Sequence, residues 1–168
     1  MKNLINLFLG ALLVISCNTD PCKDVVCGTA GTCTEGICVC DAGYEQDAAG
    51  LCNTEMRTKF IGSWVVSDSC TASVPASYTV SAINGTGIMD FNVTNFWNIF
   101  SNSVTATVSA SSEFSIARQE PDNDDFFVES VGNATLTGNT ISMTYIVSDE
   151  TDPANISRDT CYSTWVKQ

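Results

Sequence analysis

The fold is decided most clearly by residues 134–145, which read ATLTGNTISMTY. Two strand-like runs, residues 134–137 and residues 140–145, flank the dipeptide Gly138-Asn139. A two-residue turn between antiparallel strands requires a positive φ, and Gly138 adopts a positive φ without a steric penalty. This stretch therefore predicts a tight β-hairpin.

The same kind of sequence continues from about Met56 to Gln168. Ser, Thr, Val and Ile dominate, turn residues recur at short intervals, and no long segment keeps a 3.6-residue apolar period. Val104, Ala106 and Val108 alternate with hydroxylated residues, which predicts an antiparallel sheet with one solvated face. The pattern predicts a mainly β domain of about 8 strands, either an up-and-down barrel or a sandwich. We expect strands near Phe60–Ser67, Ser77–Ile83, Gly87–Val93, Ser103–Ser109, Glu113–Ala117, Phe126–Glu129, Asn133–Thr137, Thr140–Val147 and Thr160–Val166.

A dense group of cysteines precedes this domain, with the spacing C-x4-C-x5-C-x4-C-x-C-x11-C over residues 22–52. So short a segment cannot surround a hydrophobic core, so crosslinks must supply the stability that burial cannot. The spacing alone leaves many pairings open. A zinc cluster is the alternative interpretation, but an oxidising location argues against free thiolates.

Residues 38–44, CVCDAGY, together with Cys52, resemble the C-terminal signature C-x-C-x2-G-[FY] of the epidermal growth factor-like (EGF-like) module. The resemblance implies a disulfide-stapled module over residues 22–52 with a small hairpin between Cys33 and Cys40. It also implies three disulfides: Cys22–Cys33, Cys27–Cys38 and Cys40–Cys52.

Calcium binding, which some EGF-like modules show, is not supported by these residues. Pro21 occupies a position where an acidic or amide ligand is expected. Residues 34–37, TEGI, lack the Asn or Asp and the aromatic residue of the calcium-binding subclass. Calcium needs a full shell of oxygen ligands. We therefore expect this module to serve as a spacer.

The first residues predict an export signal. Lys2 supplies a positive charge, and residues 4–15 form an apolar run too short to span a bilayer. Residues 14–17, VISC, resemble a bacterial lipobox, which implies a signal peptide over residues 1–16 and acylation of Cys17. The alternative is an ordinary signal peptide cut at the same bond, which would leave Cys17 as an odd thiol in an oxidising compartment. We expect residues 17–21 to form a lipid-anchored tether.

Residues 59–64, KFIGSW, resemble the K-F-x-G-x-W first strand of the lipocalin superfamily. The resemblance implies a barrel over residues 59–168, with residues 53–58 as a linker. It further implies that Trp64 packs across the closed end, and that the open end admits a small apolar ligand. The alternative is that Trp64 is simply a core aromatic residue on the first strand.

Two further cysteines, Cys70 and Cys161, lie just after the first strand and on the last. First and last strands are neighbours in a closed meander, so we expect a fourth disulfide between them. A bond that closes so long a loop contributes about 4 to 5 kcal/mol in the chain-entropy model. It would also protect strand edges that could otherwise aggregate.

Composition excludes several classes of function. The formal net charge is −12 and the chain contains no histidine. An acidic surface is repelled by nucleic acid, so we expect no nucleic-acid partner. Without histidine, the Ser-His-Asp and Cys-His arrangements are unavailable, and no P-loop pattern occurs. We therefore expect a protein that is not an enzyme and holds no cofactor or metal.

Acidic residues gather in two stretches, residues 120–125 (EPDNDD) and residues 149–153 (DETDP). Such runs are typical of solvated turns. The alternatives are a calcium or cationic-partner site and a hydrolase that uses paired carboxylates. Aromatic residues crowd residues 91–100, and an exposed aromatic patch can contact a partner. The candidate ligand or contact aromatics are Trp64, Phe96 and Trp97.

These observations predict an exported lipoprotein anchored in the bilayer through acylated Cys17, at the outer membrane or cell surface. An EGF-like spacer would present a β-domain for surface binding or adhesion to a protein or glycan partner. The alternative is a carrier that holds a small apolar ligand in a lipocalin-like barrel, and a carboxylate-dependent hydrolase is the weaker alternative. An open cavity behind Trp64 would favour the carrier. A filled barrel with exposed Phe96 or Trp97 would favour the binding module.

Overall fold

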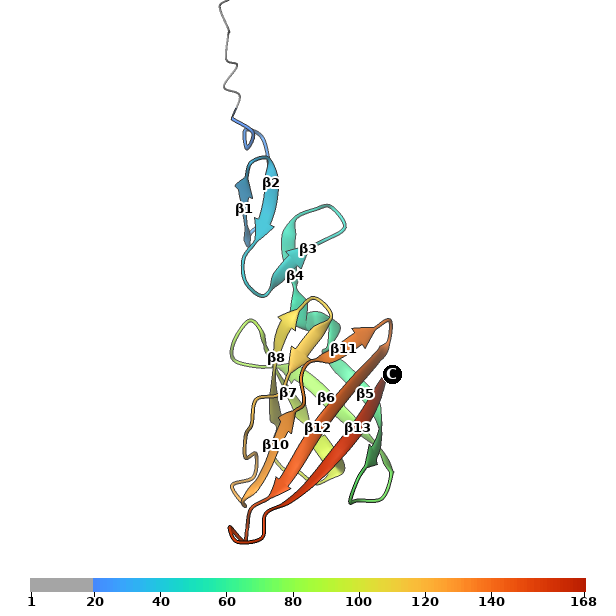
Figure 1. Ribbon diagram of the computed structural model, residues 1–168. Coiled ribbons are helices and arrows are strands. Elements are labelled where there is room, and N and C mark those ends of the chain that lie inside the picture. Colours follow the sequence, from blue (N-terminus) through green and yellow to red (C-terminus); the bar gives the residue numbers. More distant parts are fainter. Residues whose placement is uncertain (1–19) are drawn as a thin grey trace, which may run out of the picture.

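The computed structural model describes residues 20–168, so the leader and Cys17 lie outside the described residues. The described chain has two parts, a small disulfide-rich module and a β-barrel (Figure 1). The module lies at one end of the barrel, and the loop between the last two strands lies at the other end.

The N-terminal module contains two short antiparallel pairs of strands, and all its strands are three or four residues long. β1 (Gly31–Thr34) pairs with β2 (Ile37–Cys40), and β3 (Tyr44–Gln46) pairs with β4 (Cys52–Glu55). Hydrophobic burial within the module is limited to Cys27, Ala30 and Cys52. Crosslinks therefore replace a core. The three disulfides are Cys22–Cys33, Cys27–Cys38 and Cys40–Cys52, the pairs expected from the sequence.

The barrel consists of nine strands, β5 to β13. Eight of them form a closed ring in the order β5-β6-β7-β8-β9-β11-β12-β13, and β13 pairs back with β5. β10 pairs with the same edge of β12 as β11 does, further along that strand. The bounds are β5 Gly62–Cys70, β6 Ala76–Asn84, β7 Asp90–Thr94, β8 Val104–Ala110, β9 Glu113–Ser115, β10 Phe126–Ser130, β11 Ala134–Thr137, β12 Thr140–Asp149 and β13 Ser157–Lys167.

The hairpin predicted from residues 134–145 is present. β11 and β12 pair with Thr137 opposite Thr140, and Gly138 has a φ of 60°. All nine predicted strands occur, and closure of the ring shows a barrel where the sequence left a sandwich open. The long strands β12 and β13, of 10 and 11 residues, stabilise the closed ring because they pair with each other along most of their length.

The barrel interior is filled by aliphatic and aromatic side chains. Inward positions alternate along each strand, as at Val104, Ala106 and Val108 on β8. Near the module, the ring of Phe91 packs against Phe60 and Phe114, with centroids 5.5 and 5.0 Å apart. A second group lies deeper in the barrel and comprises Phe96, Tyr145 and Trp165.

Cys70 and Cys161 form the fourth disulfide. They lie directly opposite each other in the pairing of β5 with β13. The bond therefore crosslinks the two strands that close the ring, as the sequence predicts.

The module is fixed to the barrel by polar contacts. Residues 53–58, expected to be a linker, are structured: they continue β4 and enter the 3₁₀ helix η1 (Met56–Lys59). Arg57 in η1 donates to the carbonyl oxygens of Gly85, Gly87 and Asp90 at 3.1, 2.6 and 3.1 Å. On the module side, the Glu45 carboxylate accepts hydrogen bonds from Lys59 and Ser111. These contacts join the module directly to one end of the barrel.

Helices are scarce in the described chain. Besides η1 there is one short 3₁₀ helix, η2 (Phe96–Asn98). Within residues 20–168, no helix is long and apolar enough to cross a bilayer.

Candidate functional site

Two of the three candidate aromatics are buried. Trp64 is 0% exposed, and its indole N–H donates to the Phe60 carbonyl oxygen at 2.8 Å. Phe96 is also 0% exposed and packs edge-on against Tyr145. Neither side chain can contact a partner, because each lies within the hydrophobic core of the barrel. Trp97 remains as the candidate contact residue.

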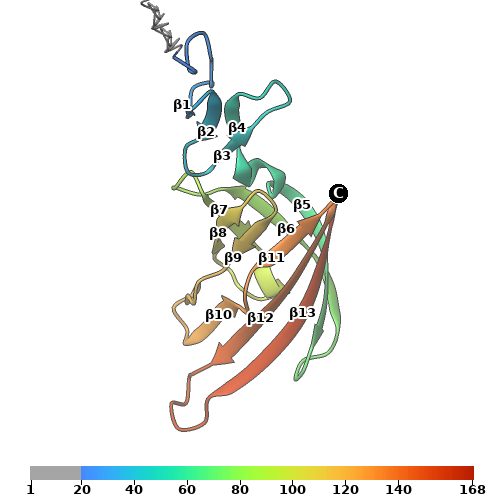
Figure 2. The same ribbon diagram turned by 45° about the horizontal axis from the view of Figure 1, so that its top comes forward.

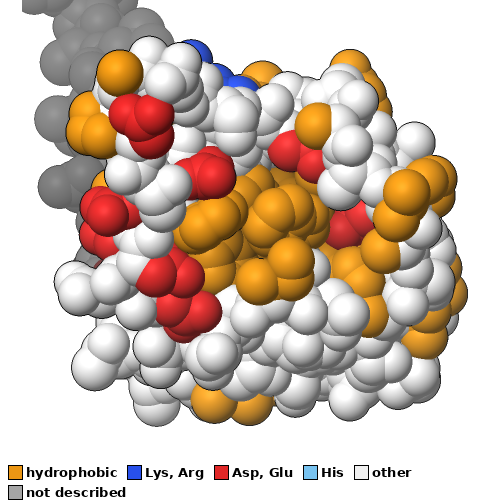
Figure 3. Space-filling view, turned by 90° about the horizontal axis from the view of Figure 1, so that it is seen from below, with side chains coloured by type: hydrophobic (Ala, Val, Ile, Leu, Met, Phe, Trp, Pro, Cys, Tyr) orange, Lys and Arg blue, Asp and Glu red, His pale blue; other side chains and the backbone are white. Residues whose placement is uncertain are grey.

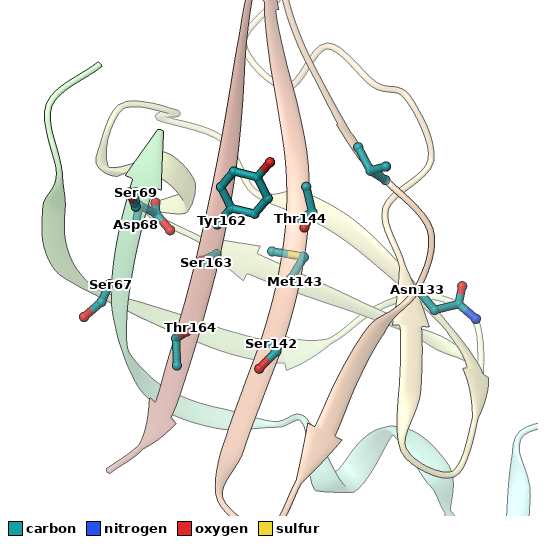
Figure 4. A pocket seen from close by; sticks show the side chains of 11 residues that line it. Ser67, Asp68, Ser69, Asn133, Ser142, Met143, Thr144, Tyr162, Ser163 and Thr164 are labelled. Atoms are coloured by element: carbon teal, nitrogen blue, oxygen red, sulfur yellow. The ribbon is translucent and has the colours of Figure 1, made fainter. Parts of the chain in front are cut away.

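The outer face of β5, β12 and β13 carries an open groove of about 560 Å³. Figure 4 shows its side chains, mostly hydroxylated, which come from all three strands. Tyr162 projects from β13 and is 61% exposed. The alternate residues Asp68, Met143 and Ser163 belong to the same strands but are buried. Asp68, Met143 and Ser163 also line this groove, which is otherwise the solvated face of the sheet.

A second candidate site lies at the end of the barrel opposite the module. Two cavities of about 280 and 190 Å³ lie there, and Trp97 and Ser73 line both. Figure 3 views this end from below and shows hydrophobic side chains in a central hollow with acidic side chains around it. We call this end the mouth and define it by Asp68, Ser73, Trp97, Phe126, Val147 and Asp159.

The larger mouth cavity lies between Trp97, Phe126 and Val147, with Asp159 at its wall. The smaller mouth cavity lies between Trp97, Val74 and Ile99, with Asp68 at its wall. Val74 and Ile99 are among the most exposed large hydrophobic residues of the described chain. Apolar side chains with a few polar groups are the usual lining of small-molecule sites.

Trp97 is held in an unfavourable backbone conformation. Its φ is 56° and its ψ is 12°, within η2, and the adjacent Asn98 and nearby Asn95 also have positive φ. Asn tolerates the left-handed region, but a bulky residue there is strained. Such strain persists only where surrounding contacts enforce it, and it gathers at ligand sites. Here the Asn95 side chain donates to the Thr79 carbonyl oxygen at 2.8 Å and anchors the turn.

A buried polar cluster lies beneath the smaller mouth cavity. The Asp68 Oδ2 atom accepts hydrogen bonds from the hydroxyls of Tyr78 and Tyr145, at 2.7 and 2.6 Å. Burial, with the nearby negative charge of Asp68, raises the pKa of both tyrosines well above the usual range, so both hydroxyls remain donors. The Asp68 Oδ1 atom is buried and has no hydrogen-bond partner.

Asp159, by contrast, accepts hydrogen bonds through both of its carboxylate oxygens. Its carboxylate accepts from the Thr71 hydroxyl and from the backbone N–H groups of Ala72 and Ser73, at 3.0, 2.7 and 2.9 Å. Burial raises the pKa of Asp159, but these hydrogen bonds outweigh burial and hold its pKa below the usual value. Asp159 thus fixes the loop that borders both mouth cavities.

Among residues 20–168, one group of three side chains has the spacing of a metal site: Cys70, Asp159 and Cys161. The two sulfur atoms are bonded to each other, and Asp159 binds the loop. The two buried carboxylates, Asp68 and Asp159, line different mouth cavities and each has its own partners. The two mouth cavities therefore share Trp97 and Ser73 but not a carboxylate.

No protein-family model matches the chain, and no curated protein matches it. This chain is similar to a solved structure of EF1p2_mFAP2b bound to DFHBI, with 11% sequence identity and a TM-score of 0.48. The match covers 67% of this chain and 97% of the other chain.

Proposed function

We propose that the protein is a non-enzymatic binding protein of the bacterial envelope that contacts its ligand through the mouth of the barrel. The observation that carries this proposal is the pair of partly apolar cavities on either side of Trp97. The interior below them is filled, so a ligand would lie against the mouth and not deep within the barrel. A partner's apolar side chain and a small apolar molecule would use the same surface.

The position of the module supports a role at a membrane surface. Four residues separate Cys17 from Cys22, and they reach about 15 to 18 Å when extended. An acylated Cys17 would therefore hold the module close to the bilayer. The mouth lies at the opposite end of the barrel (Figure 2). It would face away from the membrane, where a partner or ligand can reach it.

The experiment uses N-phenyl-1-naphthylamine, an uncharged dye whose fluorescence rises in apolar surroundings. Titration of the full chain should give saturable binding. Trp97→Ala should weaken binding of the dye about 5- to 30-fold, because an aromatic contact of this size is worth roughly 1–2 kcal/mol.

The matched control is Tyr162→Ala, which removes an exposed aromatic residue from the outer groove. It should leave binding unchanged. If Tyr162→Ala abolishes binding while Trp97→Ala does not, the binding site is the outer groove and the proposal is wrong.

A further inference from the structure

We infer that the mouth selects ligands that carry a protonated amine on a compact apolar body, and that Asp68 recognises the amine. This inference rests on the proposed function, because it names the class of ligand for the same surface. It begins from a single unusual atom, the Oδ1 oxygen of Asp68.

Asp68 occupies an inward position of β5, following Trp64 and Val66 at every second residue, and is 4% exposed. Its Oδ2 atom is satisfied by two tyrosine hydroxyls, but Oδ1 has no partner. No salt bridge within residues 20–168 involves Asp68. A buried carboxylate oxygen without a donor is costly, and natural proteins keep such groups mainly where they serve a purpose.

The surroundings favour an organic cation over a metal ion. A hard metal cation needs several oxygen ligands, whereas the other residues of the smaller mouth cavity include Val74, Ala76, Ile99 and Trp97. An ammonium group needs only a few acceptors, and its apolar body can pack on these side chains. The indole ring also attracts a cation over its face.

The charge at the mouth also favours a cationic ligand. Asp149 and Asp159 line the larger mouth cavity, and Arg158 is the basic residue that lines it. No basic residue lines the smaller mouth cavity, as far as the described chain extends. The whole chain carries a formal charge of −12. An anionic ligand would therefore be repelled, and a cationic one attracted.

Access to Asp68 requires a movement of the mouth. The Oδ1 atom is closed off from solvent, although Asp68 and Trp97 line the same cavity. Trp97 is the residue most suited to move, because its left-handed backbone is strained and a shift of this backbone to a negative φ would release the strain. Binding of the amine would thus displace the Trp97 indole.

The test compares 2-phenylethylamine with 2-phenylethanol at pH 7, where the first is a cation and the second is neutral with the same ring. Binding is followed by tryptophan fluorescence of the full chain. Trp64 and Trp165 are buried in the barrel, so a ligand at the mouth should change mainly the emission of Trp97. The amine should bind roughly tenfold more tightly than the alcohol, since a charge-assisted hydrogen bond is stronger than a neutral one.

Two variants test whether Asp68 causes the preference for the amine over the alcohol. Asp68→Asn keeps the shape and removes the charge, and should make the two probes bind equally. Tyr78→Phe removes one donor to Oδ2 and leaves the charge, and should keep the preference. Because the two probes are compared first on the unaltered chain, equal affinities there would overturn the inference even if Asp68→Asn does not fold.

Equal affinities on the unaltered chain would overturn the inference, as would a preference that survives Asp68→Asn. In either case, dye binding that depends on Trp97 would leave the proposed function standing. Failure of both phenethyl probes and of the dye to bind at the mouth would overturn both proposals.

Discussion

Arg57 shows how a single side chain joins the two parts of the molecule. Its guanidinium is buried, and its Nη1 group donates to three carbonyl oxygens at the turn between β6 and β7. Its Nε atom donates to Glu55 at 2.8 Å. The Gly87 and Asp90 carbonyl oxygens also accept from the backbone N–H groups of Asp90 and Gly85, so Arg57 adds a second donor to a turn that is already hydrogen-bonded. Arg57 therefore reinforces this turn and joins the end of the module to it.

Arg57→Met should lower the free energy of unfolding by about 2–4 kcal/mol, since it removes buried charge-assisted hydrogen bonds and leaves Glu55 unpaired. Denaturant unfolding measures this change. Arg118→Met is the matched control: Arg118 is 40% exposed in its ion pair with Glu150, so its loss should cost less than about 1 kcal/mol. Equal losses would show that the Arg57 contacts add nothing to stability.

Asp159 gives a prediction about pH. The folded pKa of Asp159 is lowered, so its carboxylate stabilises the fold above the ordinary pKa of about 3.9, and this contribution is lost as pH falls through the lower folded pKa. Asp159→Asn should therefore reduce the melting temperature at pH 7. The difference in melting temperature between the two chains should shrink below pH 4, because Asp159 of the unaltered chain becomes protonated as the pH falls. A deficit that stays constant across this pH range would contradict the assignment.

At the scale of the residue, the sequence predicts only part of the mouth. Trp97 can be selected as an aromatic residue between strands. Asp68 could have been found, because it continues the inward alternation of Trp64 and Val66. The hydrogen-bond partners of Asp68 could not have been found from the sequence, because Tyr78 and Tyr145 meet Asp68 only after β6 and β12 take their places in the ring.

At the scale of the element, the strands follow from the alternation of apolar and hydroxylated residues, and only their ends differ. The first was expected to start at Phe60, but β5 begins at Gly62 because the preceding residues form η1. The last was expected at Thr160, but β13 begins at Ser157, where it extends its pairing with β12. A barrel and a sandwich show the same alternation, so closure could not be predicted from it.

The β11–β12 turn gives a prediction at this scale. Gly138 has a φ of 60°, which a β-branched residue resists strongly. Gly138→Val should lower the free energy of unfolding by about 1–3 kcal/mol. Gly138→Asn is the control, because Asn tolerates a positive φ, and it should cost less than about 1 kcal/mol. Denaturant unfolding compares the two, and an equally mild effect of Val would show that this turn adjusts without strain.

At the scale of the whole molecule, the N-terminal module and the mouth occupy opposite ends of the barrel, with a filled interior between them (Figure 1). The cysteine spacing predicts a separate module. It does not predict the contacts between the module and the barrel, because these depend on Arg57 reaching a turn 28 to 33 residues away. In the structure these contacts place the N-terminal module at the end of the barrel opposite the mouth.

The central claim is that the mouth is the binding surface, and a map of amide chemical shifts during titration with N-phenyl-1-naphthylamine tests it most directly. We predict that the shifts concentrate at residues 68–76, 96–99, 126, 147–149 and 157–159, and that they saturate together. Shifts concentrated at residues 142–144 and 162–164, on the outer groove, would contradict the claim.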